Sequence, residues 1–419
     1  MLKILKNSWA LFTGLTLMMI AHGLQGNLLG VRAVYEKFSL IETGALMSGF
    51  YLGYLVGANQ VTNIIFKVGH IRVFAAFASM ASLSILVHSI FVNPYMWFVS
   101  RFISGFCIVG IYTIVESWLN ERATNQTRGK LLSIYMTLLY IGMGTGMFIL
   151  TFNNPKDYQP FILVSVLMSL ALVPILLTKR KAPSFKKIKP LPIKKLLNIS
   201  PYGATTSFLC GLSNSVIFTL LAVYCASMNF SLFEISLTTF IFTCMGAVSQ
   251  FPVGYVSDKS DRRKVIVTIT VLSSVIAYLI IHHTQTLTDL NSSKLLFYLL
   301  IAIFSFLCLP IFSLALSHTN DLIEKDNIVS AGSGLQFLFG VGATSGPFIG
   351  TLFMKFFGPN GLFMFVIFIH LLIATYGIWR IFIKKGQVAA TSFVGVSKAT
   401  SPLAIELSPE AQSLNKENK

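Results

Sequence analysis

The chain has 419 residues, of which 54% are hydrophobic and 11% are charged. A soluble domain carries about 25% charged residues, so this composition argues against a cytosolic enzyme, a nucleic-acid binder and a disordered protein. The formal net charge is +17, and in so hydrophobic a chain we interpret that excess as membrane topology. The lipid bilayer is therefore the first partner that the sequence predicts, and no nucleic acid is expected.

The apolar residues gather in long runs. A helix that crosses a bilayer needs about 20 mostly apolar residues, and twelve runs have this character. In chain order they cover residues 8–30, 42–66, 72–92, 95–119, 131–152, 158–178, 201–228, 233–256, 264–283, 294–318, 329–353 and 360–384. The sequence thus predicts an all-α membrane protein with twelve transmembrane helices.

The charges predict the orientation of these helices. If successive helices alternate in direction, 26 of the 32 Lys and Arg fall on the side that carries both termini. Five fall on the opposite side, and Arg101 lies within a run. Because basic residues are retained in the cytoplasm, we expect a multi-pass protein of the cell inner membrane with both termini cytoplasmic.

Charged and proline-rich stretches divide the chain into four parts. Residues 1–178 and 201–384 each hold six runs, and residues 179–200 form a Lys-rich cytoplasmic linker. This linker either lies on anionic lipid headgroups or is a solvated connection that only sets the orientation. Residues 385–419 combine Ser, Ala and mixed charge, which is typical of a disordered cytoplasmic tail.

The two six-helix parts form an internal repeat at an offset of 188–200 residues. Gly23 corresponds to Gly211, and Asn120 corresponds to Asn320. The constant order and similar spacing of these matches predict two pseudo-symmetric six-helix bundles with a site between them.

The connection between the eighth and ninth runs carries the most specific motif. It reads Gly254-Tyr-Val-Ser-Asp258-Lys-Ser-Asp261-Arg262-Arg263-Lys and resembles the cytoplasmic loop signature of the major facilitator superfamily. Asp261 stands where that family usually has Gly. The resemblance covers about residues 8–384 and implies the major facilitator fold.

The corresponding loop of the first half is degenerate. It keeps Lys67, Gly69 and Arg72 but has Thr62 and Phe66 in place of the Gly and Asp of the signature. The resemblance implies a gating role for the charged residues of both loops and for the glycine of the second loop, namely Lys67, Arg72, Gly254, Asp258, Arg262 and Arg263. Opposite charges there can pair across helix ends in the inward-closed state and separate when the inside opens, or they only satisfy the positive-inside rule.

Three further segments are similar to a branch of uncharacterised bacterial inner-membrane facilitators, namely Glu116-Ser-Trp-Leu-Asn-Glu121, His318-Thr-Asn-Asp321 and Gly69-His-Ile-Arg72. That similarity supports a transport mechanism and names no solute.

Ionisable residues inside a span are expensive and are functional candidates. Arg101 is predicted about 9 Å to the outer side of its helix midpoint, at the level of His22, Gln25 and Asn27 of the first run. It faces either water and an anionic or polar solute, or the helix carbonyls and Gln25 as a structural residue. Asn214, near the middle of the seventh run, and Gln336 of the eleventh complete the predicted cavity residues.

Four titratable residues are candidates for coupling transport to protons. His22 changes charge near physiological pH, and Glu116, His318 and Asp321 lie near the cytoplasmic helix ends. Glu116 either pairs with Arg122 or Arg128 or carries the coupling proton. His22 and His318 are equally open to a structural interpretation.

Small residues recur in the fifth and eleventh runs. Gly142 and Gly146 match the spacing of Gly342 and Gly346, and Pro347 follows. Such residues let helices approach closely and bend. The pattern Gly-x-x-x-Gly-Pro resembles one associated with exporters of the superfamily, although there it belongs to the fifth helix.

These observations favour a secondary active transporter that moves a small solute by alternating access with proton coupling. The alternative is a transporter-like sensor or assembly partner that binds a ligand without moving it. No phosphate-binding loop occurs, which favours a proton or substrate gradient as the energy source. An enzyme is not expected, because no catalytic motif or Cys/His ligand set occurs. The five Cys lie in apolar runs, so we expect no metal and no cofactor, and we expect a monomer.

Overall fold

The structure is a computed structural model that describes residues 2–124, 126–177, 190–286, 294–383, 390–396 and 400–408, apart from the side chains of residues 2–8, 122, 325 and 402. The first half holds six long helices: α1 (Leu2–Tyr35), α2 (Leu40–Val68), α3 (His70–Ile90), α4 (Pro94–Arg122), α5 (Arg128–Ile149) with the 3-10 turn η1 (Leu150–Phe152), and α6 (Gln159–Leu176). The second half holds α8 (Pro201–Ser227), α9 (Leu232–Asp258), α10 (Arg262–Thr286), α11 (Lys294–Cys308), α12 (Ile311–Asn320), α13 (Ile328–Phe357) and α14 (Gly361–Ile383).

The predicted all-α fold of twelve long helices in two bundles is confirmed. Ten described segments are long and apolar enough to cross a membrane, one of them the combined stretch Lys294–Asn320. The helices α1 and α2 complete the two sets of six by length. The tenth predicted helix is broken into α11 and α12 at Leu309 and Pro310, because proline has no amide proton and its ring displaces the preceding turn.

The duplication extends to the way the helices begin. Both α2 and α9 start with a capping box, in which a serine hydroxyl accepts from the third helical residue and that residue's glutamate side chain accepts in return. The pairs are Ser39 with Glu42 and Ser231 with Glu234. Equivalent helices of the two bundles therefore start with the same hydrogen bonds, as expected for a repeat.

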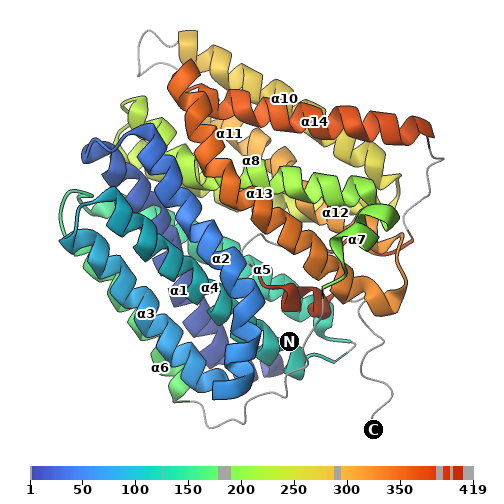
Figure 1. Cartoon of the computed structure of the whole chain (residues 1–419), viewed down its shortest axis with the longest axis horizontal. Helices are drawn as coiled ribbons and strands as arrows, with labels where there is room; N and C mark the ends of the chain where they lie inside the picture. Colours follow the sequence, from blue (N-terminus) through green and yellow to red (C-terminus); the bar gives the residue numbers. More distant parts are fainter. Residues whose placement is uncertain are drawn as a thin grey trace.

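Two close helix crossings organise the bundles (Figure 1). A Cβ added to Gly146 of α5 would lie 2.0 Å from the Ile20 carbonyl oxygen of α1, and one added to Gly142 would lie 2.7 Å from the Met19 Cβ. In the second half, a Cβ on Gly346 of α13 would lie 2.2 Å from the Ser215 hydroxyl of α8. The backbones of α1 and α5, and of α8 and α13, touch only because these positions lack side chains.

Filling one crossing should destabilise the protein. We expect Gly146→Ala to lower the free energy of unfolding by about 1–3 kcal/mol, because the added methyl group must push a backbone carbonyl away. Gly26→Ala on α1 is the matched control, since a Cβ there meets no atom within 4 Å. Thermal unfolding of the detergent-solubilised variants measures the difference, and equal melting temperatures would contradict the crossing.

The two bundles contact each other directly at the ends that face away from the linker. There the Asn27 amide of α1 donates to the Thr239 hydroxyl of α9 at 2.7 Å. Nearby, the rings of Phe148 and Phe233 lie 6.0 Å apart, and Gly44 of α2 lies against Thr351 of α13. This half of the interface is closed.

At the linker-side ends, a segment of the chain separates the bundles. Residues 390–396 and 400–408, the latter including the 3-10 helix η3 (Pro402–Leu407), lie between α4, α5, α12 and α13. The prediction of a disordered tail is wrong for these residues. Although the segment is polar on average, its few apolar side chains pack between the bundles. Those 3% exposed or less include Val394, Val396, Ala404, Ile405 and Leu407.

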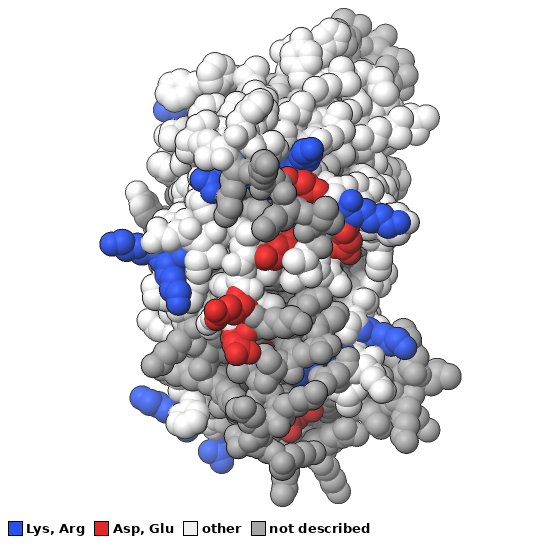
Figure 2. Space-filling model, turned by 90° about the vertical axis from the view of Figure 1, so that its right-hand side faces the viewer, with Lys and Arg blue, Asp and Glu red and all other residues white. Residues whose placement is uncertain are grey.

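The linker is described from residue 190 onward. There the short helix α7 (Ile193–Ile199) docks on the C-terminal bundle: the Leu191 amide donates to the Ser330 carbonyl at 2.9 Å, and Leu196 is fully buried. Figure 2 shows the right-hand side of the view in Figure 1, with acidic residues near the middle and most Lys and Arg toward the edges. The predictions for residues 178–189 lie outside the described residues.

Candidate functional site

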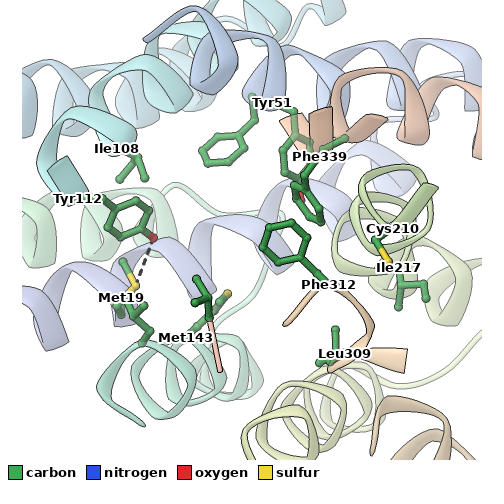
Figure 3. Close-up of a cluster of buried hydrophobic side chains, with 14 of the residues drawn as sticks. Met19, Tyr51, Ile108, Tyr112, Met143, Cys210, Ile217, Leu309, Phe312 and Phe339 are labelled. Atoms are coloured by element: carbon green, nitrogen blue, oxygen red, sulfur yellow. Dashed lines mark hydrogen bonds between the residues drawn. The ribbon is translucent and has the colours of Figure 1, made fainter. Parts of the chain in front are cut away.

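Aromatic side chains from both bundles face each other across the interface (Figure 3). Tyr51 and Tyr112 come from α2 and α4, and Phe312 and Phe339 come from α12 and α13. The two phenylalanine rings lie 4.9 Å apart, while the Tyr112 hydroxyl donates to the Met19 sulfur at 3.4 Å. A largely apolar wall with a few polar groups is the composition of small-molecule sites.

Arg101, near these aromatic residues, is a buried charge with unused hydrogen-bond donors. Its side chain is 2% exposed, and its guanidinium lies 4.6 Å from the ring centroid of Phe50 on α2. The imidazole of His22 lies 5.1 Å from the same ring. Nε and Nη1 of Arg101, and Oε1 of Gln25, have no hydrogen-bond partner in the part of the chain that the structure describes. A buried cation with unused donors is suited to receive an anionic or polar group.

The amide of Gln25 continues into the N-terminal bundle. It donates to the Ser104 hydroxyl at 3.3 Å, which lies 2.6 Å from the Ser84 hydroxyl. The Ser84 carbonyl in turn lies 2.7 Å from Nδ1 of His88. Gln25 is thus held on its donor side by α4 and α3, while its oxygen Oε1 has no partner among the described residues.

Two other predicted cavity residues have mainly structural contacts. Asn27 bridges the bundles, since its amide also donates to the Met147 carbonyl at 3.2 Å. Asn214 faces the interior of the C-terminal bundle, where the Cys308 thiol donates to its side-chain oxygen at 3.5 Å. The Cys308 sulfur lies 3.7 Å from the His370 imidazole.

Two predicted residues bind the C-terminal segment: Gln336, a predicted cavity residue, and Glu116, a candidate for proton coupling. The Gln336 amide of α13 donates to the Thr400 carbonyl, which also accepts from the Tyr54 hydroxyl of α2 at 2.6 Å. The Glu116 carboxylate is fully buried and accepts from the Tyr135 hydroxyl at 2.6 Å and the Ser401 amide at 2.9 Å. Arg128 instead donates to the Glu406 carbonyl at 2.8 Å.

The predicted gating charges of the second loop do pair across helix ends. Arg262 of α10 is 1% exposed and contacts Asp258 at 3.1 Å and Asp321 at 2.7 Å. Arg263 pairs with Asp261 at 2.8 Å. Burial alone would raise the pKa of Asp261, but hydrogen bonds from Arg263 outweigh it and hold that pKa below its ordinary value. This ion pair therefore persists at neutral pH and weakens only as the pH falls through the lowered pKa.

These pairs join α9, α10 and the end of α12, all in the C-terminal bundle, so they fasten that bundle rather than bridging to its partner. His318 lies beside them, with its ring 5.9 Å from that of Tyr202. The first-half loop differs: Lys67 and Arg72 are exposed and take part in no ion pair within the described ranges.

The two carboxylates that pair with Arg262 should contribute unequally to the stability of the protein. Asp321 is 10% exposed and Asp258 is 39% exposed. We expect Asp321→Asn to lower the free energy of unfolding by about 3 kcal/mol, as for a broken buried pair, and Asp258→Asn by about 1 kcal/mol or less. Thermal unfolding of the two variants tests this order, and a larger effect of Asp258→Asn would reverse the assignment.

Sequence reasoning missed Phe50, Tyr54 and Ser401. Aromatic residues are too common in spans to single out from the sequence. Ser401 does have a signal, because Ser followed by Pro402 is a typical helix start, and its hydroxyl caps η3 by accepting from the Leu403 amide. No group of three His, Cys, Asp or Glu side chains that could hold a metal occurs among the residues described.

The family model of the Major Facilitator Superfamily matches residues 8–202 and again residues 203–407, so each half matches separately. The chain belongs to the Major Facilitator Superfamily. It is 23% identical over 367 residues to the uncharacterized MFS-type transporter YcaD of Escherichia fergusonii, a match that covers 86% of this chain and 93% of the relative. The YcaD protein of Shigella flexneri is 22% identical over the same shares.

Solved structures share the fold of this superfamily member. The nucleoside transporter NupG superposes with a TM-score of 0.74 at 11% identity, covering 90% of this chain and 99% of that one. A bacterial homolog of the human lysosomal transporter Spinster, in an inward-facing and unoccupied conformation, gives 0.70 at 13% identity and covers 91% and 99%. The chain is therefore a membrane transporter of the superfamily fold, as the predicted resemblance implied.

Proposed function

We propose that this protein is a secondary active transporter that moves a small solute with an anionic or polar group across the inner membrane by alternating access. The observation that supports this most is Arg101, a buried guanidinium with two unpaired nitrogens beside the interface of two bundles. A solute that supplies hydrogen-bond acceptors there would satisfy a charge that the protein leaves unsatisfied.

The arrangement of the bundles agrees with alternating access. The bundles touch through Asn27 and Thr239 at one end, whereas residues 390–396 and 400–408 lie between them at the linker side. By the positive-inside rule the linker side is cytoplasmic, so this arrangement corresponds to an inward-facing molecule. Labelling of a cysteine introduced at Lys194 with an impermeant reagent tests the orientation: reaction from outside intact cells would reverse it.

Proton coupling is the second part of the proposal. Four titratable candidates remain, and Glu116 is the one we favour, because it is a fully buried carboxylate at the interface. Its Ser401 donors would exchange for water if the C-terminal segment left, whereas the Tyr135 hydroxyl of α5 would remain bound. His22 is the alternative near Arg101, while His318 and Asp321 belong to the ion-pair cluster of the C-terminal bundle.

The proposal is tested in two steps. A thermal-shift screen of carboxylates, phosphorylated metabolites and neutral polar compounds identifies ligands, since a bound ligand stabilises the state that it binds. Uptake of a labelled hit into proteoliposomes is then measured with and without a pH gradient. Gradient-driven accumulation supports coupled transport. A ligand that binds and never crosses would favour the sensor, and uptake equal in both conditions would reject proton coupling.

A further inference from the structure

The C-terminal residues 390–396 and 400–408, called here the plug, are bound by both bundles. Its first part belongs to the C-terminal bundle: the amides of Val394 and Val396 each donate at 3.1 Å to Ser317 and Ser313 of α12. Near its start, Thr391 donates its amide to Asp321 at 2.8 Å.

The second part of the plug is bound mainly by the N-terminal bundle. Glu116 accepts from Ser401, Asn120 of α4 donates to the Leu403 carbonyl at 2.8 Å, and Arg128 of α5 donates to the Glu406 carbonyl. These bonds are made by backbone groups of the plug, so they fix the course of its main chain. The plug therefore crosses from one bundle to the other.

Apolar contacts close the remaining space. Leu403, Ala404, Ile405 and Leu407 are 6% exposed or less, and a Cβ on Gly332 of α13 would lie 2.4 Å from Cδ1 of Ile405. On the other flank, residues Phe393 to Val396 line a cavity of about 380 Å³ between α5 and α9. The plug thus fills the opening between the bundles on the linker side, and the cavity lined by residues 393–396 lies next to it.

We propose that residues 390–396 and 400–408 form a self-occluding plug, which closes the linker-side opening and must leave before a solute can pass. The plug occupies the hydrogen-bonding groups of Gln336, a predicted cavity residue, and of Glu116, the proposed proton carrier. Rocking moves the bundles relative to each other, so a segment hydrogen-bonded to both must release at least one. The claim that the plug blocks transport rests on the proposed function. The docking of the plug between the bundles does not depend on the identity of the solute.

The docking is tested with Gly332→Cys, whose thiol lies under Ile405 while the plug is in place. Because the added Cβ would lie 2.4 Å from Cδ1 of Ile405, that flexible side chain must turn away, and all variants are therefore compared in this same Gly332→Cys background. The reaction rate of purified full-length Gly332→Cys with a polar maleimide reports how often the plug leaves. Ser401→Pro removes both donors to Glu116 and suits the Ser401 φ of −85°. Ser408→Ala is the control, because the Ser408 hydroxyl has no partner within the described segments. We expect Ser401→Pro to speed labelling at least about tenfold, a change of about 1.4 kcal/mol in the opening equilibrium, and Ser408→Ala to leave it unchanged.

A reversible lock then tests the consequence. In Gly332→Cys with Ile405→Cys, the two side chains are within disulfide reach, since a Cβ at Gly332 also lies 3.1 Å from Cγ2 of Ile405. Oxidation should abolish solute uptake and reduction should restore it in the same sample, which rules out misfolding. Equal labelling of the Ser401→Pro and Ser408→Ala forms, or full uptake by the oxidised lock, would overturn the plug. If even the reduced form moves no solute, the transport proposal fails while the labelling result still decides the plug.

Discussion

Replacing Arg101 by Ala is expected to lower solute uptake at limiting concentration by about 10- to 100-fold, because charge-assisted hydrogen bonds contribute about 1.5–3 kcal/mol. Nε and Nη1 of the guanidinium have no partner within the described ranges, so these bonds are available to the solute. The same substitution should leave the melting temperature equal or higher, since it removes a buried and incompletely paired charge. The measurement is proteoliposome uptake together with thermal unfolding.

Two variants sharpen this test. Arg101→Lys keeps the charge but loses the planar fork of donors, so we expect intermediate uptake. Lys355→Ala removes an exposed charge at the end of α13 and should change nothing. Wild-type uptake by Arg101→Ala would remove this residue from the site, and a large loss of stability would assign Arg101 a structural role.

Glu116→Gln should uncouple transport from protons. The amide keeps the size of the carboxylate and an oxygen that accepts from Tyr135, but it cannot bind and release a proton. We expect accumulation driven by a pH gradient to disappear, with about wild-type exchange of labelled for unlabelled solute across the membrane. Comparing the two assays separates coupling from binding.

Because Glu116 also binds the plug, Ser401→Ala is the control that matters for this variant. It removes the hydroxyl donor to Glu116 and keeps the carboxylate. If Ser401→Ala alone abolished gradient-driven accumulation, the effect of Glu116→Gln would belong to the plug. Gradient-driven accumulation of wild-type size in Glu116→Gln would leave His22 as the coupling candidate.

Only part of the candidate site could be predicted from the sequence. Arg101, His22 and Gln25 could be singled out because charged and amide groups in a span are costly wherever they point. Phe50, which lies beside both Arg101 and His22, could not be chosen among 36 phenylalanines, because its role depends on the rotation of α2 against α4. Asn214 was placed at the cavity by the same reasoning, yet its contact with Cys308 shows it turned into its own bundle.

Hydropathy, charge and the internal repeat by themselves determined the twelve helices and the two bundles, because each of these depends on neighbouring residues or on a fixed offset along the chain. The family was indicated by the resemblance of the loop from Gly254 to Arg263. Only the tertiary structure decided where the C-terminal segment lies. Glu116 and Ser401 are 285 residues apart. The sequence around Ser401 gives no indication that its amide donates to a buried carboxylate. A polar segment with scattered apolar residues is disordered in water and ordered between two bundles, since the bundles supply both the hydrogen-bond partners and the apolar walls that water cannot.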